Sequence, residues 1–267
     1  MGDQVIRVAV LGAGGRMGSE VCRAVKDDPD MELVAAVEPN PGGDTGITDP
    51  GTTLTAIDEL KDKSVDVAVD FTNSASVAGN VEWCLNHSVH VVVGTTGISE
   101  QEMDGFEELA QSSSANVLVA PNFAIGAVLM MYFAKLAAAW MDSAEIIELH
   151  HQGKLDSPSG TAIKTAEAII AGRMEDVQHE TENAGELKQT LAGARGAELD
   201  GVRIHSLRLP GLVAHQEVIF GGEGQTLSIR HDTTDRTSFM PGVLLAIREV
   251  SKHRGLTRGL DELLHLR

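Results

Sequence analysis

Short runs of apolar and β-branched residues alternate with longer stretches of helical periodicity over the first half of the chain. The apolar runs predict strands, and they cover Val5–Leu11, Glu32–Val37, Val65–Asp70, Val89–Val93 and Asn116–Ala120. Stretches that predict helices lie between them, among them Gly18–Lys26, Ser76–Leu85 and Glu100–Gln111. Apolar strands separated by helices are typical of a parallel sheet buried on both faces. This half therefore predicts a doubly wound α/β domain, in which ligands bind outside the carboxyl ends of the strands.

The alternation ends after about Phe123, where a different order of elements begins. The predicted elements are a long helix from Ala124 to about Met141, a strand Glu145–Leu149, a helix from about Thr161 to Arg173, strands Val202–Leu209, Leu212–Phe220 and Gln225–His231, and a last helix Pro241–Ser251. The polar stretch Met174–Gly201 predicts a long surface connection, and Gly221–Gly224 predicts a hairpin between the last two strands. This order predicts a smaller α+β domain with a mixed or antiparallel sheet.

The composition narrows the classes of partner. A formal net charge of −18 argues against a general nucleic-acid binder, which needs a basic surface. A solvated surface is the favoured explanation of this acidity, with an acidic binding face or adaptation to a salty cytoplasm as alternatives. The hydrophobic content of 42% is ordinary for a globular protein with a buried core.

The cysteines and the N-terminus point to a cytoplasmic protein. Cys22 and Cys84 lie in stretches of helical periodicity without Cys/His metal spacing, which predicts buried thiols in a reducing compartment and no metal. The N-terminus enters a predicted strand almost at once, and no signal peptide is expected. The apolar stretch Phe123–Trp140 contains Lys135 and predicts a buried helix, so no membrane partner is expected.

A glycine-rich turn, Gly12–Gly18, directly follows the first predicted strand and opens the first predicted helix. Backbone N–H groups of such a turn approach a pyrophosphate at the helix N-terminus, where the helix dipole favours negative charge. The alternative is a turn that only packs helix against strand. The candidate cofactor-binding residues of this turn are Gly12, Ala13, Gly14, Gly15, Arg16 and Met17.

Glu38 supports the dinucleotide interpretation, because it stands at the end of the second predicted strand, about 20 residues after the turn. At this spacing, an acidic residue of a dinucleotide-binding domain can bind ribose hydroxyls. The next residue is Pro39, so no arginine follows to neutralise a 2′-phosphate, although Arg16 could do part of that work. NADH is therefore the preferred cofactor, with NADPH as the alternative.

Three further loops follow predicted strands: Asp70–Thr72, Gly94–Gly97 and Ala120–Phe123. Singly, each is equally consistent with an N-cap or a turn. Together, at one edge of one sheet, they predict the nicotinamide end of the cleft. The candidate cofactor-binding residues in the last two loops are Gly94, Thr95, Thr96, Ala120, Pro121, Asn122 and Phe123.

Side chains that can bind anions or transfer protons are most concentrated between Glu148 and Thr161. Here His150, His151 and Lys154 precede a Pro-Ser-Gly-Thr turn that begins a predicted helix. Successive residues of a strand face opposite ways, so the strand should end here if both histidines serve one site. Lys154 and the helix N-terminus suit a small carboxylate, and a histidine suits proton donation. The candidate substrate-binding residues are His151, Lys154, Ser159, Gly160 and Thr161.

Other interpretations exist for parts of this segment. Ser157 or Ser159 is equally consistent with an ordinary N-cap. Zinc ligation is disfavoured, because no third ligand has a matching spacing. A serine nucleophile at Ser159 is excluded, because the G-x-S-x-G pattern is missing.

The chain resembles the 4-hydroxy-tetrahydrodipicolinate reductase (dihydrodipicolinate reductase) family over almost its whole length. The resemblance rests on the Gly12–Gly18 turn, Glu38, the loops Gly94–Gly97 and Ala120–Phe123, and above all on the pattern E-x-H-H-x-x-K-x-D-x-P-S-G-T-A of Glu148–Ala162. Two departures are Pro39, where some relatives have a basic residue, and Gln152-Gly153, where others often have a third basic residue.

The resemblance implies an NAD(P)H-dependent reductase of the diaminopimelate–lysine pathway, which reduces a cyclic imine dicarboxylate. It implies that His150 and Lys154 are catalytic proton donors, and that His151, Lys154, Gly160 and Thr161 hold a substrate carboxylate. It also implies a Rossmann-type domain, residues 1–125 and 237–267, completed by the C-terminal segment. Residues 126–236 would then bind substrate and build a homotetramer.

Two rival functions remain. A related Rossmann dehydrogenase acting on another amino-acid precursor, such as an aspartate-derived aldehyde, would need a cysteine nucleophile or an Asp/Lys pair in place of His-His-x-x-Lys. A dinucleotide-sensing protein without turnover would have no need of proton donors, so His150 and Lys154 count against it.

Overall fold

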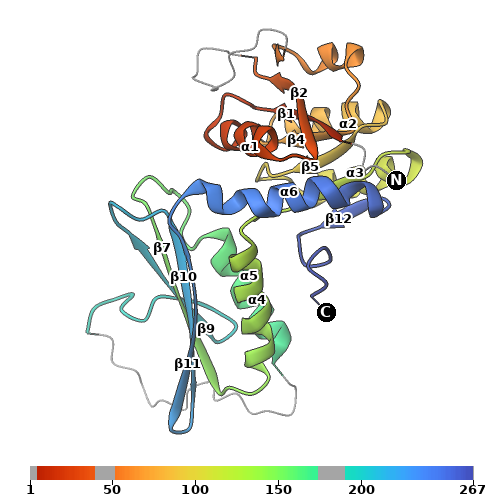
Figure 1. Cartoon of the computed structure of the whole chain (residues 1–267). Coiled ribbons are helices and arrows are strands. Elements are labelled where there is room, and N and C mark those ends of the chain that lie inside the picture. Colours follow the sequence, from red (N-terminus) through yellow and green to blue (C-terminus); the bar gives the residue numbers. More distant parts are fainter. Residues whose placement is uncertain (1–4, 40–51, 174–189, 267) are drawn as a thin grey trace. The chain divides into compact units, whose positions relative to one another are not determined.

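The computed structural model describes residues 5–39, 52–173 and 190–266. The chain divides into two compact units (Figure 1). Unit 1 consists of Met1–Ala124 and Phe239–Arg267, and unit 2 consists of Ile125–Ser238. Each unit has its own sheet and its own apolar core.

Unit 1 contains a seven-stranded sheet of order β12-β6-β5-β4-β1-β2-β3, in which every pairing is parallel. The strands are β1 Ile6–Leu11, β2 Met31–Val37, β3 Thr53–Leu54, β4 Val67–Asp70, β5 His90–Val93, β6 Val117–Val119 and β12 Leu256–Arg258. The helices are α1 Arg16–Asp27, α2 Val77–Asn86, α3 Glu100–Ser112 and α6 Met240–Glu249, with short 3₁₀ turns at Ile57–Asp62 and Val250–Lys252. A further 3₁₀ turn, Arg236–Phe239, spans the boundary between the two units along the chain. The predicted doubly wound α/β architecture is confirmed.

The strands of unit 1 are apolar because both of their faces are covered. Along β1, Val8 and Ala9 are fully buried although they point to opposite faces. Helices α2 and α3 pack on the face that contains Ala9, and α1 and α6 contact each other (Figure 1). The sequence did not predict β3 and β12, which have two and three residues and are too short to show a period.

Unit 2 contains a five-stranded mixed sheet of order β11-β10-β7-β9-β8. Its strands are β7 Ser143–His150, β8 Ala197–Leu199, β9 Val202–Arg208, β10 Ala214–Gly222 and β11 Gln225–Thr233. Strands β7 and β9 are parallel and the other pairs are antiparallel, with the predicted hairpin joining β10 to β11. Helices α4 Ile125–Ala138 and α5 Gly160–Gly172 pack against one another and cover one face of the sheet (Figure 1).

The predicted surface connection Met174–Gly201 requires a correction. Its residues 174–189 lie outside the described part of the chain. Strand β8 lies within its remainder and pairs with β9 at the edge of the sheet, through Ala197 opposite Ile204. The sequence did not predict β8, because the strand has only three residues and two of them, Ala197 and Glu198, are exposed and show no strand pattern.

The described residues contain neither a membrane-spanning helix nor a metal-binding cluster. No helix among them is long and apolar enough to cross a bilayer. Within the same residues, no group of three or more His, Cys, Asp or Glu side chains could hold a metal ion.

Candidate active site

The glycine-rich turn after β1 has the geometry of a phosphate-binding turn. Gly12 has a φ of +77°, a conformation that L side chains rarely adopt, and a Cβ here would lie 2.7 Å from the carbonyl oxygen of Phe71. Helix α1 begins at Arg16, with Gly15 as its N-cap, so its first N–H groups open toward the turn. The backbone and the helix dipole therefore suit a pyrophosphate.

Glu38 lies against this turn. Its Oε2 accepts a hydrogen bond of 3.0 Å from the backbone N–H of Gly14, and a Cβ at Gly14 would lie 2.8 Å from that oxygen. A side chain at this position would displace the carboxylate. The structure thus brings together the glycine turn and the acidic residue that the sequence assigned to the ribose, and these residues fit a dinucleotide.

Two adjoining cavities run along the carboxyl ends of the unit 1 strands, with volumes of about 470 and 520 Å³. They share Gly15, Phe71 and Thr72. The predicted cofactor residues that line them are Gly12, Gly15, Arg16, Met17, Glu38, Gly94, Thr95, Thr96, Pro121, Asn122 and Phe123. Ala13, Gly14 and Ala120 do not line them, and both alanines are buried.

A fully buried carboxylate, Asp70, holds the loops of this groove in place. Its Oδ1 accepts hydrogen bonds from the Thr72 backbone at 3.0 Å, the Thr72 hydroxyl at 2.8 Å and the Thr95 hydroxyl at 2.7 Å. Its Oδ2 accepts a 2.7 Å hydrogen bond from Asn80 of α2. The Thr95 hydroxyl therefore positions the loop that carries it.

Sequence reasoning missed two aromatic residues of the groove, Phe71 and Phe239. Phe71 lies in a loop that the sequence did single out, and its ring lies 5.8 Å from that of Phe123. Phe239 comes from the C-terminal segment, and no local pattern places it beside residues more than a hundred positions earlier.

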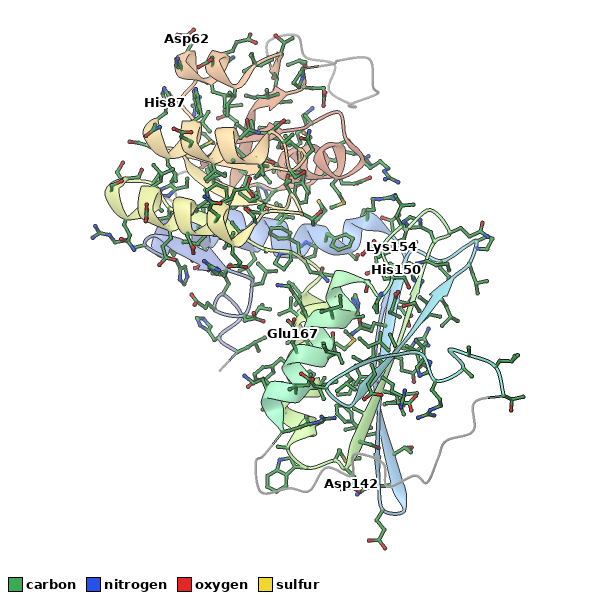
Figure 2. All side chains as sticks on the ribbon, turned by 180° about the vertical axis from the view of Figure 1, so that it is seen from behind. Asp62, His87, Asp142, His150, Lys154 and Glu167 are labelled. Carbon is green, nitrogen blue, oxygen red and sulfur yellow. The ribbon has the colours of Figure 1, made fainter. Side chains whose placement is uncertain are left out.

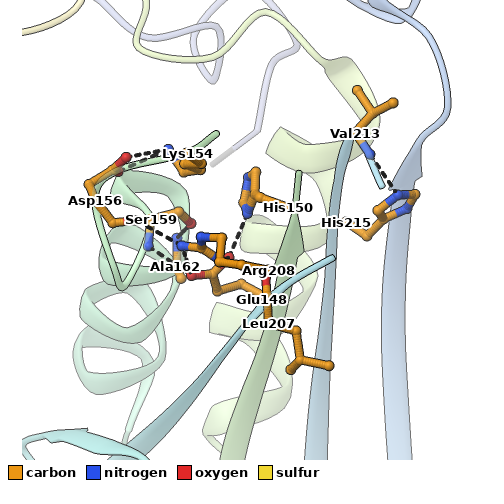
Figure 3. Close-up of polar contacts among 10 residues, drawn as sticks. All are labelled: Glu148, His150, Lys154, Asp156, Ser159, Ala162, Leu207, Arg208, Val213 and His215. Atoms are coloured by element: carbon orange, nitrogen blue, oxygen red, sulfur yellow. Dashed lines mark hydrogen bonds and ion pairs between the residues drawn. The ribbon is translucent and has the colours of Figure 1, made fainter. Parts of the chain in front are cut away.

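Unit 2 presents His150 at the end of β7, where the strand was predicted to stop. Glu148 lies two residues earlier, so both side chains point to the same face of the sheet. The Glu148 side chain is fully buried, and its Oε2 lies 2.5 Å from Nδ1 of His150 (Figure 3). The His150 side chain remains 14% exposed. The His150 ring is thus held by Glu148 through Nδ1, and its other nitrogen, Nε2, points away from Glu148.

Glu148 is ionised at neutral pH despite its burial. Burial would raise the pKa of this carboxyl, but hydrogen bonds from His150, Arg208 and Ser206 outweigh it and lower the pKa to about 2. The Ser159 backbone N–H adds a further contact at 3.2 Å. An ionised carboxylate only accepts hydrogen bonds, so it can hold a protonated Nδ1.

Lys154 lies in the loop after β7, at the same end of the unit 2 sheet as His150 (Figure 2). Its Nζ forms an ion pair with both Asp156 oxygens, at 2.8 and 2.9 Å. Asp156 is more than half exposed, so this partner can be exchanged for another carboxylate. His151 lies in the same loop, close to Gly153, where a Cβ would lie 3.3 Å from its Nδ1.

Ser159 is the N-cap of α5. Its side chain is buried, and its hydroxyl accepts a 3.2 Å hydrogen bond from the backbone of Ala162. Its own N–H donates to Glu148. The capping interpretation therefore describes Ser159 in this structure, and its assignment as a substrate contact stays a prediction. Gly160 and Thr161 form the first turn of α5, where the dipole favours an anion.

The cysteine-nucleophile form of the alternative that acts on an aspartate-derived aldehyde finds no exposed thiol here. Cys22 and Cys84 are both buried free thiols. Burial raises the pKa of Cys22 to about 12, which keeps it in the unreactive thiol form.

The chain is similar to known proteins over almost its whole length. Residues 6–123 match the family model described as dihydrodipicolinate reductase, N-terminus, and residues 126–264 match dihydrodipicolinate reductase, C-terminus. The chain is 48% identical over 262 residues to the 4-hydroxy-tetrahydrodipicolinate reductase of Corynebacterium aurimucosum, covering 98% of this chain and 99% of that one. It is 49% identical to the reductase of Cutibacterium acnes, covering 98% and 100%.

Solved structures give the same result. A dipicolinate-bound dihydrodipicolinate reductase from a Paenisporosarcina species superposes with a TM-score of 0.87 at 42% identity, covering 97% of this chain and 99% of that chain. An amine dehydrogenase from Mycobacterium smegmatis, at 17% identity and a TM-score of 0.68, shares the fold alone. The chain therefore belongs to the dihydrodipicolinate reductase family of pyridine-nucleotide-dependent oxidoreductases.

Proposed function

We propose that the chain reduces 4-hydroxy-tetrahydrodipicolinate, through dihydrodipicolinate, to tetrahydrodipicolinate in diaminopimelate and lysine biosynthesis. The observation that carries the proposal is His150 anchored on a buried carboxylate, with Lys154 in the following loop, in a chain related over its full length to reductases of this name.

The nicotinamide cofactor supplies the hydride, and the residues of the chain bind, orient and protonate. The Gly12–Gly18 turn and Glu38 hold the dinucleotide, while Lys154, His151 and the first turn of α5 hold a substrate carboxylate. Hydride addition to a ring carbon leaves an electron pair on the substrate. Nε2 of protonated His150 delivers the balancing proton, and Lys154 assists by its positive charge.

A coupled assay tests the proposed activity. Absorbance at 340 nm should fall when the protein, reduced cofactor and enzymatically generated substrate are combined, and it should stay constant when the substrate is left out. Oxidation at equal rates with and without substrate would refute the proposed reaction.

We also propose that NADH binds at least as well as NADPH. Glu38 accepts hydrogen bonds from the adenosine ribose and repels a 2′-phosphate. Glu38→Ala should weaken NADH binding about tenfold, as expected for hydrogen bonds to a charged group, and NADPH binding less. Titration calorimetry measures both affinities. Glu32→Ala, an exposed glutamate of the same strand, is the control. Equal losses for the two cofactors, or a strong NADPH preference of the parent, would contradict the ribose assignment.

We further propose a cytoplasmic homotetramer. The face of the unit 2 sheet opposite α4 and α5 carries half-buried apolar side chains at Ile147, Leu149, Leu207 and Ile219, which a second sheet could cover. Light scattering at micromolar concentration should give a mass of about 113 kDa, four times the 28.3 kDa of one chain. A monomeric mass would contradict the proposal.

A further inference from the structure

Arg208 is the last residue of β9, and its backbone lies opposite His150 in the parallel β7–β9 pair. Its guanidinium contacts both oxygens of Glu148, with Nη1 at 2.9 Å from Oε2 and Nη2 at 2.8 Å from Oε1 (Figure 3). The contact is therefore the two-pronged pairing that a planar guanidinium forms with a carboxylate. Arg208 is 60 residues away from Glu148 in the sequence.

This pairing decides the state of the His150 ring. A carboxylate as buried as Glu148 stays ionised only when charged and polar donors surround it. With Arg208 in place, Glu148 is acceptor-only, so the nitrogen that faces it, Nδ1 of His150, must carry a hydrogen. The proton that the ring can give up is then the one on Nε2.

The same guanidinium also holds the loop after β7. Nη2 of Arg208 donates a 2.7 Å hydrogen bond to the backbone carbonyl of Asp156, whose carboxylate binds Lys154. Hydrogen bonds therefore link Arg208 to His150 through Glu148, and to Lys154 through Asp156. A lysine at 208 would lose the two-pronged pairing with Glu148, because an ammonium is a point charge without a planar fork.

We propose that Arg208 is a positioning residue of this enzyme: through Glu148 it holds His150 with Nδ1 protonated and Nε2 as the donor, and through the Asp156 carbonyl it orders the loop that carries Lys154. This inference rests on the proposed function for its kinetic consequences. Its structural part, the protonation of Nδ1, holds whatever the substrate is.

The kinetic experiment compares Arg208→Met, Arg208→Lys and the control Arg203→Met. Arg203 lies on the same strand, is 20% exposed against 19% for Arg208, and is likewise paired with a glutamate, Glu198 at 3.0 Å. Arg208→Met should lower kcat about tenfold and weaken pyridine-2,6-dicarboxylate severalfold, with NADH affinity within twofold of the parent. Arg208→Lys should have an intermediate kcat. Arg203→Met should match the parent in kcat and in its mass by light scattering, the second readout being included because Arg203 shares one face of β9 with Leu207.

A spectroscopic experiment observes the tautomer of His150 directly, first in the parent and then in Arg208→Met. Long-range ¹⁵N spectra of the parent, labelled at histidine and recorded at a pH where the rings are neutral, should show His150 protonated at Nδ1, with its signal assigned by its loss in His150→Gln. In folded Arg208→Met that signal should become a mixture of the two ring tautomers.

Three results would overturn the inference: kcat of folded Arg208→Met within twofold of the parent, equal losses in Arg203→Met, or a neutral His150 protonated at Nε2 in the parent. If the parent shows no reductase activity, the proposed function fails instead. The tautomer of the parent and the binding of pyridine-2,6-dicarboxylate then decide the role of Arg208.

Discussion

His150→Ala should lower kcat by about 10²–10⁴-fold, the range for loss of a general acid. The ring supplies the proton that balances hydride transfer, and alanine leaves neither a donor nor a path to it. The dinucleotide groove lies wholly in unit 1, so the affinity for NADH should not change. Stopped-flow or steady-state oxidation at 340 nm gives kcat, and calorimetry gives the cofactor affinity.

His205→Ala is the matched control for this variant. His205 also belongs to the unit 2 sheet and also pairs with a glutamate, through Nε2 at 2.7 Å from Glu145. Both variants remove a histidine from a His–Glu pair, but only one removes the ring at the end of β7. If folded His150→Ala kept near-full turnover, the assignment of the acid would be wrong, and Lys154 would have to supply the proton alone.

Lys154→Ala should weaken both pyridine-2,6-dicarboxylate and the substrate. The flat dicarboxylate presents two anions but cannot accept a hydride, so it should compete with the substrate. A charge-assisted hydrogen bond in a partly desolvated site contributes about 1.5–3 kcal/mol, or roughly 10–150-fold in affinity. The observed loss is a net value, because the incoming carboxylate replaces Asp156 on the lysine.

Calorimetric titration of the inhibitor and the apparent KM of the substrate measure this effect. Lys164→Ala is the control, because Lys164 is an exposed lysine of the neighbouring helix α5. Unchanged inhibitor affinity in Lys154→Ala, or an equal loss in Lys164→Ala, would show that the ammonium does not hold the carboxylate.

The two replacements separate the two roles in unit 2. Loss of the acid should appear mainly in kcat, because it acts on charge that develops in the transition state. Loss of the carboxylate contact should also appear in inhibitor binding, because the inhibitor carries the same anions as the substrate.

Local features of this protein were readable from the chain. The apolar runs predicted the central strands of the parallel sheet, since a strand buried on both faces has no polar side. The end of β7 at His150 and the start of α1 at the glycine turn were predicted from local residue patterns. Such features depend on backbone conformation and on neighbours within a few positions.

The contacts that organise the site are of another kind. Arg208 reaches Glu148 across 60 residues, Asp70 binds a threonine hydroxyl 25 residues away, and Phe239 joins a groove formed by the first half of the chain. No periodicity or spacing encodes such pairs, because each depends on which strands become neighbours. The sequence by itself thus determines the central strands, the local turns and the chemically functional residues. The partners that orient His150 and Lys154 are decided only by strand pairing in the folded sheet.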